Sequence, residues 1–216
     1  MPELPEVETV CLALSKIVYN SKIEDVDVLR SDLRWKIKKS LKHDLENDYF
    51  KQPLRRGKYI LIPTIKDNIF LIHLGMSGQI KIRDNFESIF KHDHVRVTIK
   101  SENDKRYFIT YNDPRRFGFI DLFHKKEINE HFLLKKLGVE PFEKNFNVGY
   151  LQSMFDKKMK CIKDTLMDQS VIAGIGNIYA SEILFKAKVN PYRSAKTLNN
   201  EEIKSIIGAT IEVLKK

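Results

Sequence analysis

The chain has 216 residues, which suffice for one large domain or two small ones and for a sizeable hydrophobic core. Hydrophobic residues make up 42% and charged residues 31%, so the composition excludes a fully disordered chain. The 38 basic and 29 acidic residues leave a net charge of +9, which favours a polyanionic partner, either nucleic acid or an anionic membrane.

Cysteine usage and the N-terminus indicate the compartment. The two cysteines, Cys11 and Cys161, exclude a disulfide framework and a four-cysteine zinc site within these residues, and this usage fits a reducing cytosol. Glutamates occupy the N-terminus where a signal peptide carries lysines and then an apolar stretch, and no apolar run approaches membrane-spanning length. We therefore expect a cytoplasmic protein with no membrane partner.

The first part of the chain combines one helix with many strands. Apolar residues recur at helical spacing from Pro5 to Val18, which predicts an amphipathic helix. Between residues 22 and 123 the apolar period changes to two, clearest at Ile80, Ile82, Val95, Val97, Ile99, Tyr107, Ile109 and Tyr111. Turn-forming residues separate these runs at 67–68, 75–78, 101–104 and 113–114. This pattern predicts an antiparallel β-sandwich or barrel.

The second part is predicted to be helical. Helical spacing returns after residue 124, at Leu133, Leu134, Leu137, Tyr150, Leu151, Met154, Phe155, Ile178, Ile183 and Leu184. A last helix begins at Asn199, and Asn199 and Glu202 are placed as a capping box. The fold class is therefore α+β with several domains: a β-rich domain over 1–124, a connector over 125–145 and a helical domain over 146–216.

The final helix reaches the last residue without a capping residue, glycine or proline. We therefore expect the chain to be a fragment. If the missing segment packs on this helix, part of its apolar face, including Ile207, Ile211 and Leu214, is expected to be short of packing partners.

The N-terminus, MPELPE, is the first motif with chemical meaning. Removal of Met1 would leave Pro2 with a free secondary amine, and an α-amino group has a pKa of about 7.7 to 8.0. Such an amine can attack a sugar C1′ to form an iminium, while Glu3 protonates the ring oxygen or the departing base. The alternative is structural: Pro2 and Pro5 begin a helix, and the glutamates complement its dipole.

A glycine turn opens a helix at 174–180, GIGNIYA. Amides at a helix start, such as those near Gly176, bind phosphate well. The segment lacks the third glycine of a dinucleotide-binding fingerprint and follows no predicted strand, so that interpretation fails. Lys160, Lys163 and Asn177 favour a phosphate clamp over the alternative of a plain interhelical turn.

Three further segments place basic and bulky residues at turns: RRGKY at 55–59, HLGMSG at 73–78 and NDPRRFG at 112–118. Their cations suit backbone phosphates, and Met76 and Phe117 can wedge into a base stack. Taken singly, each segment is better explained as an ordinary hairpin with a core side chain and solvated arginines. His92 and His94 resemble half of a metal site, but we expect surface strand histidines and no metal.

These motifs together closely resemble the bacterial formamidopyrimidine-DNA glycosylase family. The resemblance lies in MPELPEVETV, RRGKY, HLGMSG, NDPRRFG and LMDQSVIAGIGNIYASEILF at 166–185, which agree in order and spacing and span essentially the whole chain. The related endonuclease VIII branch shares the N-terminal chemistry but reads differently after Pro2 and Glu3, which favours the first branch.

The resemblance implies roles for individual residues. Pro2 would be the nucleophile that forms a Schiff base with C1′, Glu3 the acid that helps to open the sugar, and Glu6 a supporting carboxylate. Lys58 would lie beside the phosphate of the damaged nucleotide and assist β,δ-elimination.

Other residues would bind the DNA. Met76, Arg115 and Phe117 would fill the gap left by the everted base, with Arg115 facing the orphaned partner and Phe117 wedged into the stack. Lys163 and Asn177 would hold phosphates within a helix-two-turn-helix motif.

The implied function is DNA base-excision repair by a bifunctional glycosylase and abasic-site lyase that removes 8-oxoguanine and formamidopyrimidines. The partner would be double-stranded DNA containing such lesions or abasic sites, bound by a monomer at the nucleoid. Family members continue into a lesion-capping loop and a four-cysteine zinc finger, so we expect one zinc in a full-length member and no cofactor within this chain. The alternatives are a non-catalytic binder of damaged or abasic duplex and an RNA-binding accessory protein, which needs only the charge.

Overall fold

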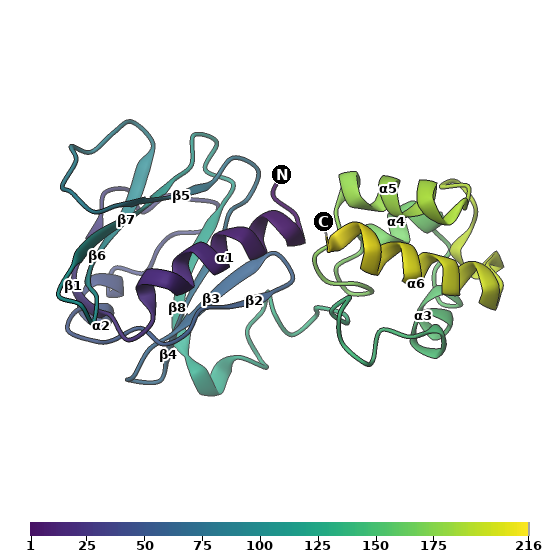
Figure 1. Ribbon diagram of the computed structural model, residues 1–216, viewed down its shortest axis with the longest axis horizontal. Helices are drawn as coiled ribbons and strands as arrows, with labels where there is room; N and C mark the ends of the chain where they lie inside the picture. Colours follow the sequence, from purple (N-terminus) through teal and green to yellow (C-terminus); the bar gives the residue numbers. More distant parts are fainter. Residues whose placement is uncertain (216) are drawn as a thin grey trace. The chain divides into compact units, whose positions relative to one another are not determined.

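The computed structural model describes residues 1–215, which form two compact units (Figure 1). The first unit contains residues 1–2 and 6–130, and the second contains residues 3–5 and 131–215. Strands occur in the first unit and most helices in the second, so the predicted fold class is confirmed.

The first unit contains two antiparallel four-stranded sheets and the helix α1 (Leu4–Val18), whose first two residues belong to the second unit. One sheet has the order β1 (Lys22–Val28), β6 (Asp93–Lys100), β7 (Arg106–Asn112), β5 (Gln79–Arg83). The other has the order β2 (Leu54–Arg56), β3 (Tyr59–Pro63), β4 (Asn68–His73), β8 (Phe119–His124). A short helix η1 (Lys125–Glu127) follows β8.

The predicted turns join these strands, and apolar side chains from both sheets and α1 share one core. The period-two residues Val95, Val97 and Ile99 are all buried in it. A short helix, α2 (Leu41–Leu45), was not predicted. Its signal is the pair of buried leucines four residues apart, Leu41 and Leu45.

The second unit is built from α3 (Val148–Phe155), α4 (Ile162–Met167), α5 (Asn177–Ala187), η2 (Ala195–Thr197) and α6 (Asn200–Leu214), which surround a second core. Figure 1 shows α4, α5 and α6 grouped together. No helix within residues 1–215 is both long and apolar enough to span a bilayer.

The helical prediction around Leu133, Leu134 and Leu137 was wrong. These residues form successive turns, in which Leu134 N–H donates to His131 O (2.9 Å) and Leu137 N–H to Leu134 O (3.0 Å). Gly138 explains the interruption, because a Cβ there would lie 2.3 Å from Val171 O. The chain must approach the backbone of the 168–175 loop at this point, which a continuing helix would prevent.

The capping box of α6 is confirmed: Asn199 Oδ1 accepts from Glu202 N–H (2.9 Å), and Glu202 Oε2 accepts from Asn199 N–H (3.0 Å). The expectation that the end of this helix lacks partners was wrong for Leu214, which is buried in the second core, and for Ile207, which packs against it. The reason is that α6 lies against both α3 and α5. Ile211 is half-buried.

Candidate functional site

Glu3 is buried at the N-terminus of α5, with only 2% of its surface exposed. Its Oε2 accepts hydrogen bonds from the N–H groups of Gly176 (2.6 Å) and Tyr179 (3.3 Å), and its Oε1 accepts one from Ile178 (3.0 Å). The first amides of a helix have no partners within the helix and form the positive end of its dipole. The Glu3 carboxylate therefore occupies an anion site made by its own chain.

The next residue strengthens this attachment. Leu4 N–H donates to Gly174 O (3.0 Å), and the Leu4 side chain is buried in the second core. Gly174 has φ +96°, and a Cβ there would lie 2.7 Å from Leu4 Cδ1. Only glycine combines this backbone conformation with such a close approach, so the glycine turn is shaped to receive residues 3 and 4.

Side chains that the sequence analysis did not single out brace this turn. Gln169 Nε2 donates to Ile175 O (2.7 Å), and its Oε1 accepts from Gly174 N–H (2.9 Å). Asp168 accepts from Lys158 Nζ (2.7 Å) and from the Ser170 hydroxyl (2.6 Å). Burial alone would raise the pKa of Asp168, but these donors outweigh it and lower the pKa to about 2.

Met76, Arg115 and Phe117 come from two different turns of the first unit and line one pocket of about 700 Å³. We call it the Met1 pocket, since Met1 also lines it. Met76 and Phe117 are 43% and 45% exposed, so neither is the ordinary core side chain of the alternative interpretation. The Arg115 guanidinium lies 4.8 Å from the centre of the Phe117 ring. The other lining residues are Asp32, Leu33, Arg34, His73, Gly75 and Arg116.

Tight backbone contacts hold the two turns together. Gly75 has φ +62°, and a Cβ there would lie 2.5 Å from Gly118 N and from the Phe117 carbonyl carbon. Arg116 adopts φ +58° and pairs with Asp32 (2.8 Å). Arg116 therefore links this turn to the loop that follows β1.

Lys58 is only 6% exposed and follows the β2–β3 turn at Gly57, which has φ +56°. Arg55 holds this hairpin against α1, because its Nε donates to Glu8 Oε2 (2.5 Å) and its Nη1 to Gly57 O (3.1 Å). The sequence analysis assigned Lys58 a role but missed Arg55 and Glu8, which are 47 residues apart in the chain.

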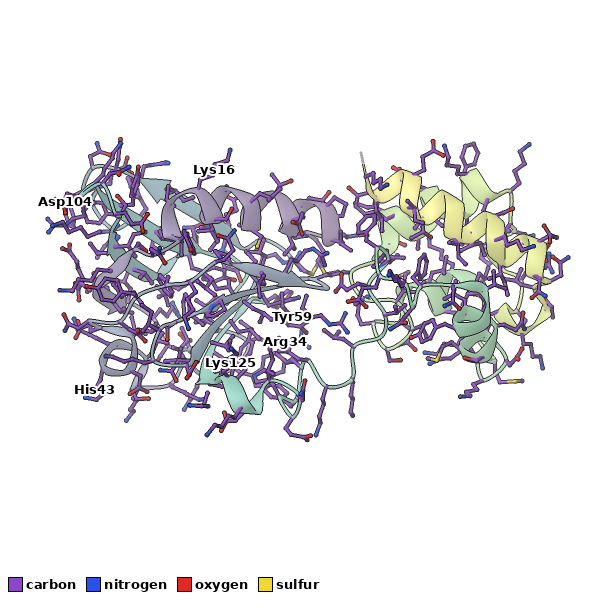
Figure 2. The ribbon with its side chains drawn as sticks, turned by 60° about the horizontal axis from the view of Figure 1, so that its bottom comes forward. Lys16, Arg34, His43, Tyr59, Asp104 and Lys125 are labelled. Carbon is purple, nitrogen blue, oxygen red and sulfur yellow. The ribbon has the colours of Figure 1, made fainter. Side chains whose placement is uncertain are left out.

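His73 is a site residue that the sequence analysis also missed, although it opens the HLGMSG motif. Its Nδ1 accepts a hydrogen bond from Gly75 N–H (3.2 Å). Burial, followed by the positive charges of Lys58 and Arg34, lowers its pKa to about 4. Figure 2 shows Arg34 close to Tyr59, whose ring lies 4.9 Å from that of His73. A neutral imidazole therefore faces the Met1 pocket at pH 7.

Lys163 and Asn177, the predicted phosphate ligands, line a pocket of about 810 Å³ in the second unit. We call it the α5 pocket; the exposed Phe185 and Tyr192 also line it. The role suggested for the Gly176 amide needs correction, because this N–H donates to Glu3. The start of α5 therefore holds the carboxylate of Glu3 where a phosphate was expected.

The structure also shows where Glu6 and the two histidines His92 and His94 lie. Glu6 is exposed in the first turn of α1 and lines neither pocket. His94 was expected on a surface strand, but it is 2% exposed, and its Nε2 donates to Asp113 O (2.7 Å). His92 lies in the turn before β6 with φ +74°. Over residues 1–215 no three His, Cys, Asp or Glu side chains are grouped as metal ligands would be.

Comparison with known proteins covers nearly the whole chain. The family described as the formamidopyrimidine-DNA glycosylase N-terminal domain matches residues 1–120, and the family described as the formamidopyrimidine-DNA glycosylase H2TH domain matches residues 137–216. The formamidopyrimidine-DNA glycosylase of Bartonella henselae is 42% identical over 92% of this chain and 71% of its own length. That of Zymomonas mobilis is 42% identical over 100% of this chain and 78% of its own length.

Solved structures agree with these matches. A structure of the Lactococcus lactis enzyme, bound non-covalently to DNA that contains an abasic site, superposes with a TM-score of 0.90 at 30% identity. It covers 99% of this chain and 80% of the L. lactis chain. Another structure of that enzyme, with DNA containing N7-benzyl-Fapy-dG, superposes with a TM-score of 0.90 at 31% identity over 99% and 78% of the two chains.

The depressed pKa of His73 predicts a pH dependence of stability. The unfolded chain binds a proton at this histidine below about pH 6.5, whereas the folded protein does so only below about pH 4. Stability should therefore fall as the pH drops from about 6.5 to about 4, by at most about 3 kcal/mol.

Urea unfolding at a series of pH values measures this slope. His73→Gln should flatten it, whereas His43→Gln should not, because the side chain of His43 is 93% exposed (Figure 2). An identical slope in wild type and His73→Gln would show that another group titrates.

Proposed function

Since this chain belongs to the formamidopyrimidine-DNA glycosylase family, whose members act in DNA base-excision repair, we propose that it excises oxidised purines and then cleaves the abasic site as a lyase. The substrates would be 8-oxoguanine and formamidopyrimidines in duplex DNA, bound by a monomer at the nucleoid. The observation that carries the proposal is the buried carboxylate of Glu3, fixed beside the residue whose nitrogen becomes the amine.

Removal of Met1 would generate the nucleophile. Met1 lines the Met1 pocket, so the new terminus at Pro2 lies where an everted nucleotide can reach it. The Glu3 carboxylate accepts hydrogen bonds from backbone amides at the start of α5, at the positive end of the helix dipole. As a carboxylate, Glu3 can take the proton of the Pro2 ammonium and free the amine lone pair.

The reaction then proceeds through an iminium. The Pro2 nitrogen attacks C1′ and the bond from C1′ to the base breaks; the base leaves with the bonding electrons and takes up the proton that the Pro2 nitrogen releases. The lone pair restored on the nitrogen next expels O4′, which Glu3 protonates, and an iminium forms between Pro2 and C1′. Loss of a C2′ proton then breaks the bond from C3′ to its phosphate oxygen by β-elimination. Lys58 assists the second, δ-elimination, in which loss of a C4′ proton breaks the bond from C5′ to its phosphate oxygen.

Eversion of the base explains the other residues of the Met1 pocket. The glycosidic bond is screened inside a duplex, so the base must leave the stack before an amine can reach C1′. Met76 and Phe117 are exposed apolar side chains suited to filling the gap, and Arg115 adds donors that can face the orphaned base. Lys163 and Asn177, at the α5 pocket, would hold backbone phosphates.

The four-cysteine zinc site expected in longer family members cannot form from the two cysteines of these residues. Such a site takes four cysteines, and the chain has two. Cys11 is buried in the first unit, where burial raises its thiol pKa to about 11, and Cys161 lies in the second unit.

Borohydride trapping tests the Schiff base. The processed protein should become covalently linked to abasic-site duplex, because hydride reduces the iminium irreversibly. A form that retains Met1 should lose at least about tenfold in trapped product, because an amide nitrogen has no free lone pair for attack.

The control is Lys58→Ala, which removes the nearby alternative amine and should still be trapped. Equal trapping of all forms would show that Pro2 is not the nucleophile. Binding without trapping by the processed protein would favour the non-catalytic alternative.

Salt dependence tests the phosphate clamp. Each phosphate contact contributes about 0.9 to the slope of log K against log salt concentration, so Lys163→Ala should lower the magnitude of that slope by about one unit. Lesion preference should not change. Lys16→Ala, which removes an exposed charge from α1 (Figure 2), is the matched control, and an equal effect of both variants would mean that Lys163 contributes only general charge.

A further inference from the structure

Asp113 is a fully buried carboxylate just after β7, with 0% of its surface exposed. Its Oδ1 accepts from the Ser77 hydroxyl (2.5 Å) and from Arg115 N–H (3.2 Å). Its Oδ2 accepts from Gly118 N–H (2.8 Å) and from the Tyr111 hydroxyl (3.1 Å). Each carboxylate oxygen of Asp113 therefore accepts two hydrogen bonds, and all four donors belong to the protein itself.

These donors keep Asp113 ionised. Burial alone would raise its pKa, but the hydrogen bonds from Ser77, Gly118, Tyr111 and Arg115 outweigh burial and hold the pKa below its usual range. Burial and the negative charge of Asp113 raise the pKa of Tyr111, so its hydroxyl remains a donor. The arrangement is thus fixed in one protonation state near neutral pH.

Three of these donors belong to two different turns, whereas Tyr111 lies in β7. Ser77 follows Met76 in the first turn, whereas Arg115 and Gly118 flank Phe117 in the second. The Ser77 hydroxyl oxygen also accepts from Arg115 N–H (3.3 Å), so the two turns share a hydrogen-bonded network around one carboxylate. Met76 and Phe117, which lie outside this network, are half-exposed above it.

We propose that Asp113, through Ser77, is a positioning residue that holds the Met76 turn and the Arg115–Phe117 turn as one preformed wedge for opening base pairs. This inference rests on the proposed function, since it specifies how the Met1 pocket engages duplex DNA. Asp113 does not touch the DNA. It acts by setting where Met76 and Phe117 enter the stack.

The physical reason is preorganisation. If the two turns moved independently, part of the binding free energy would be spent on ordering them at the moment of insertion. The ordering cost slows insertion where a base pair must be opened. It has little effect on insertion where the stack is already open. Loss of the network should therefore impair action on paired lesions selectively, whereas general destabilisation would affect paired and unpaired lesions alike.

The experiment compares 8-oxoguanine opposite cytosine with 8-oxoguanine in a loop of mismatched nucleotides. A 2-aminopurine beside the lesion reports opening by fluorescence, and excision is followed in the same samples. Ser77→Ala removes the bond between the turns and should slow opening of the paired lesion about fivefold, corresponding to about 1 kcal/mol. Opening at the mismatched loop should change less than about twofold, and Ser77→Thr, which keeps the hydroxyl, should restore the rate.

Asp113→Asn is the stronger variant, because its amide group must face either the Gly118 or the Arg115 N–H and leaves one buried donor unpaired. It should slow opening of the paired lesion at least about tenfold. Asp48→Asn is the matched control: Asp48 is a buried aspartate of the same unit that accepts from Tyr49 N–H (2.7 Å) and Lys66 N–H (3.2 Å). It should leave the ratio of paired to unpaired opening unchanged.

An unchanged ratio of paired to unpaired opening in both Ser77→Ala and Asp113→Asn would overturn the inference, as would equal losses that Asp48→Asn reproduces. A wild-type protein that opens paired lesions but excises none would refute the proposed chemistry and leave the wedge standing. A wild-type protein that excises the lesion without a change in 2-aminopurine fluorescence would refute the wedge alone.

Discussion

The burial of the Glu3 carboxylate at the start of α5 is the interaction on which the candidate site depends. A charge without partners is costly to bury, and chain termini are usually frayed. Here three amides of one helix end receive the carboxylate, and Leu4 bonds to the same turn. The beginning of the chain is thereby held by residues that follow it by more than 170 positions. Because Pro2 is joined directly to Glu3, this anchoring also limits the movement of the Pro2 nitrogen.

The remaining site geometry follows the same principle of a short segment held by buried polar groups. Asp113 secures the two turns that present Met76 and Phe117, and Arg55 secures the hairpin that carries Lys58. These supporting groups make their hydrogen bonds within the protein. Chemistry-bearing side chains therefore lie on turns, where they can reach a ligand, while the rigidity comes from carboxylates and guanidinium groups beneath them.

Local signals were predictable from the sequence. The period-two strands at Val95–Ile99 and the capping box at Asn199 depend on residues close in the chain, and both were confirmed. The start of α5 was read correctly as an anion site, but its anion lies 173 residues away in Glu3, a distance that no local pattern spans. The predictions of an exposed His94 and of a helix around Leu134 were wrong for the same reason. The contacts that decide these structures come from Asp113 and Val171, which are distant in the sequence.

The amide spectrum of the protein tests the anchoring of Glu3 most directly. In ¹H–¹⁵N spectra the Gly176, Ile178 and Tyr179 amide protons should be shifted downfield and protected from solvent exchange. In Glu3→Gln, whose side-chain amide must face one of these donors, the three signals should move upfield and exchange faster, while the Glu202 amide in the α6 capping box stays unchanged. Unchanged shifts and protection of all three amides in Glu3→Gln would contradict the account.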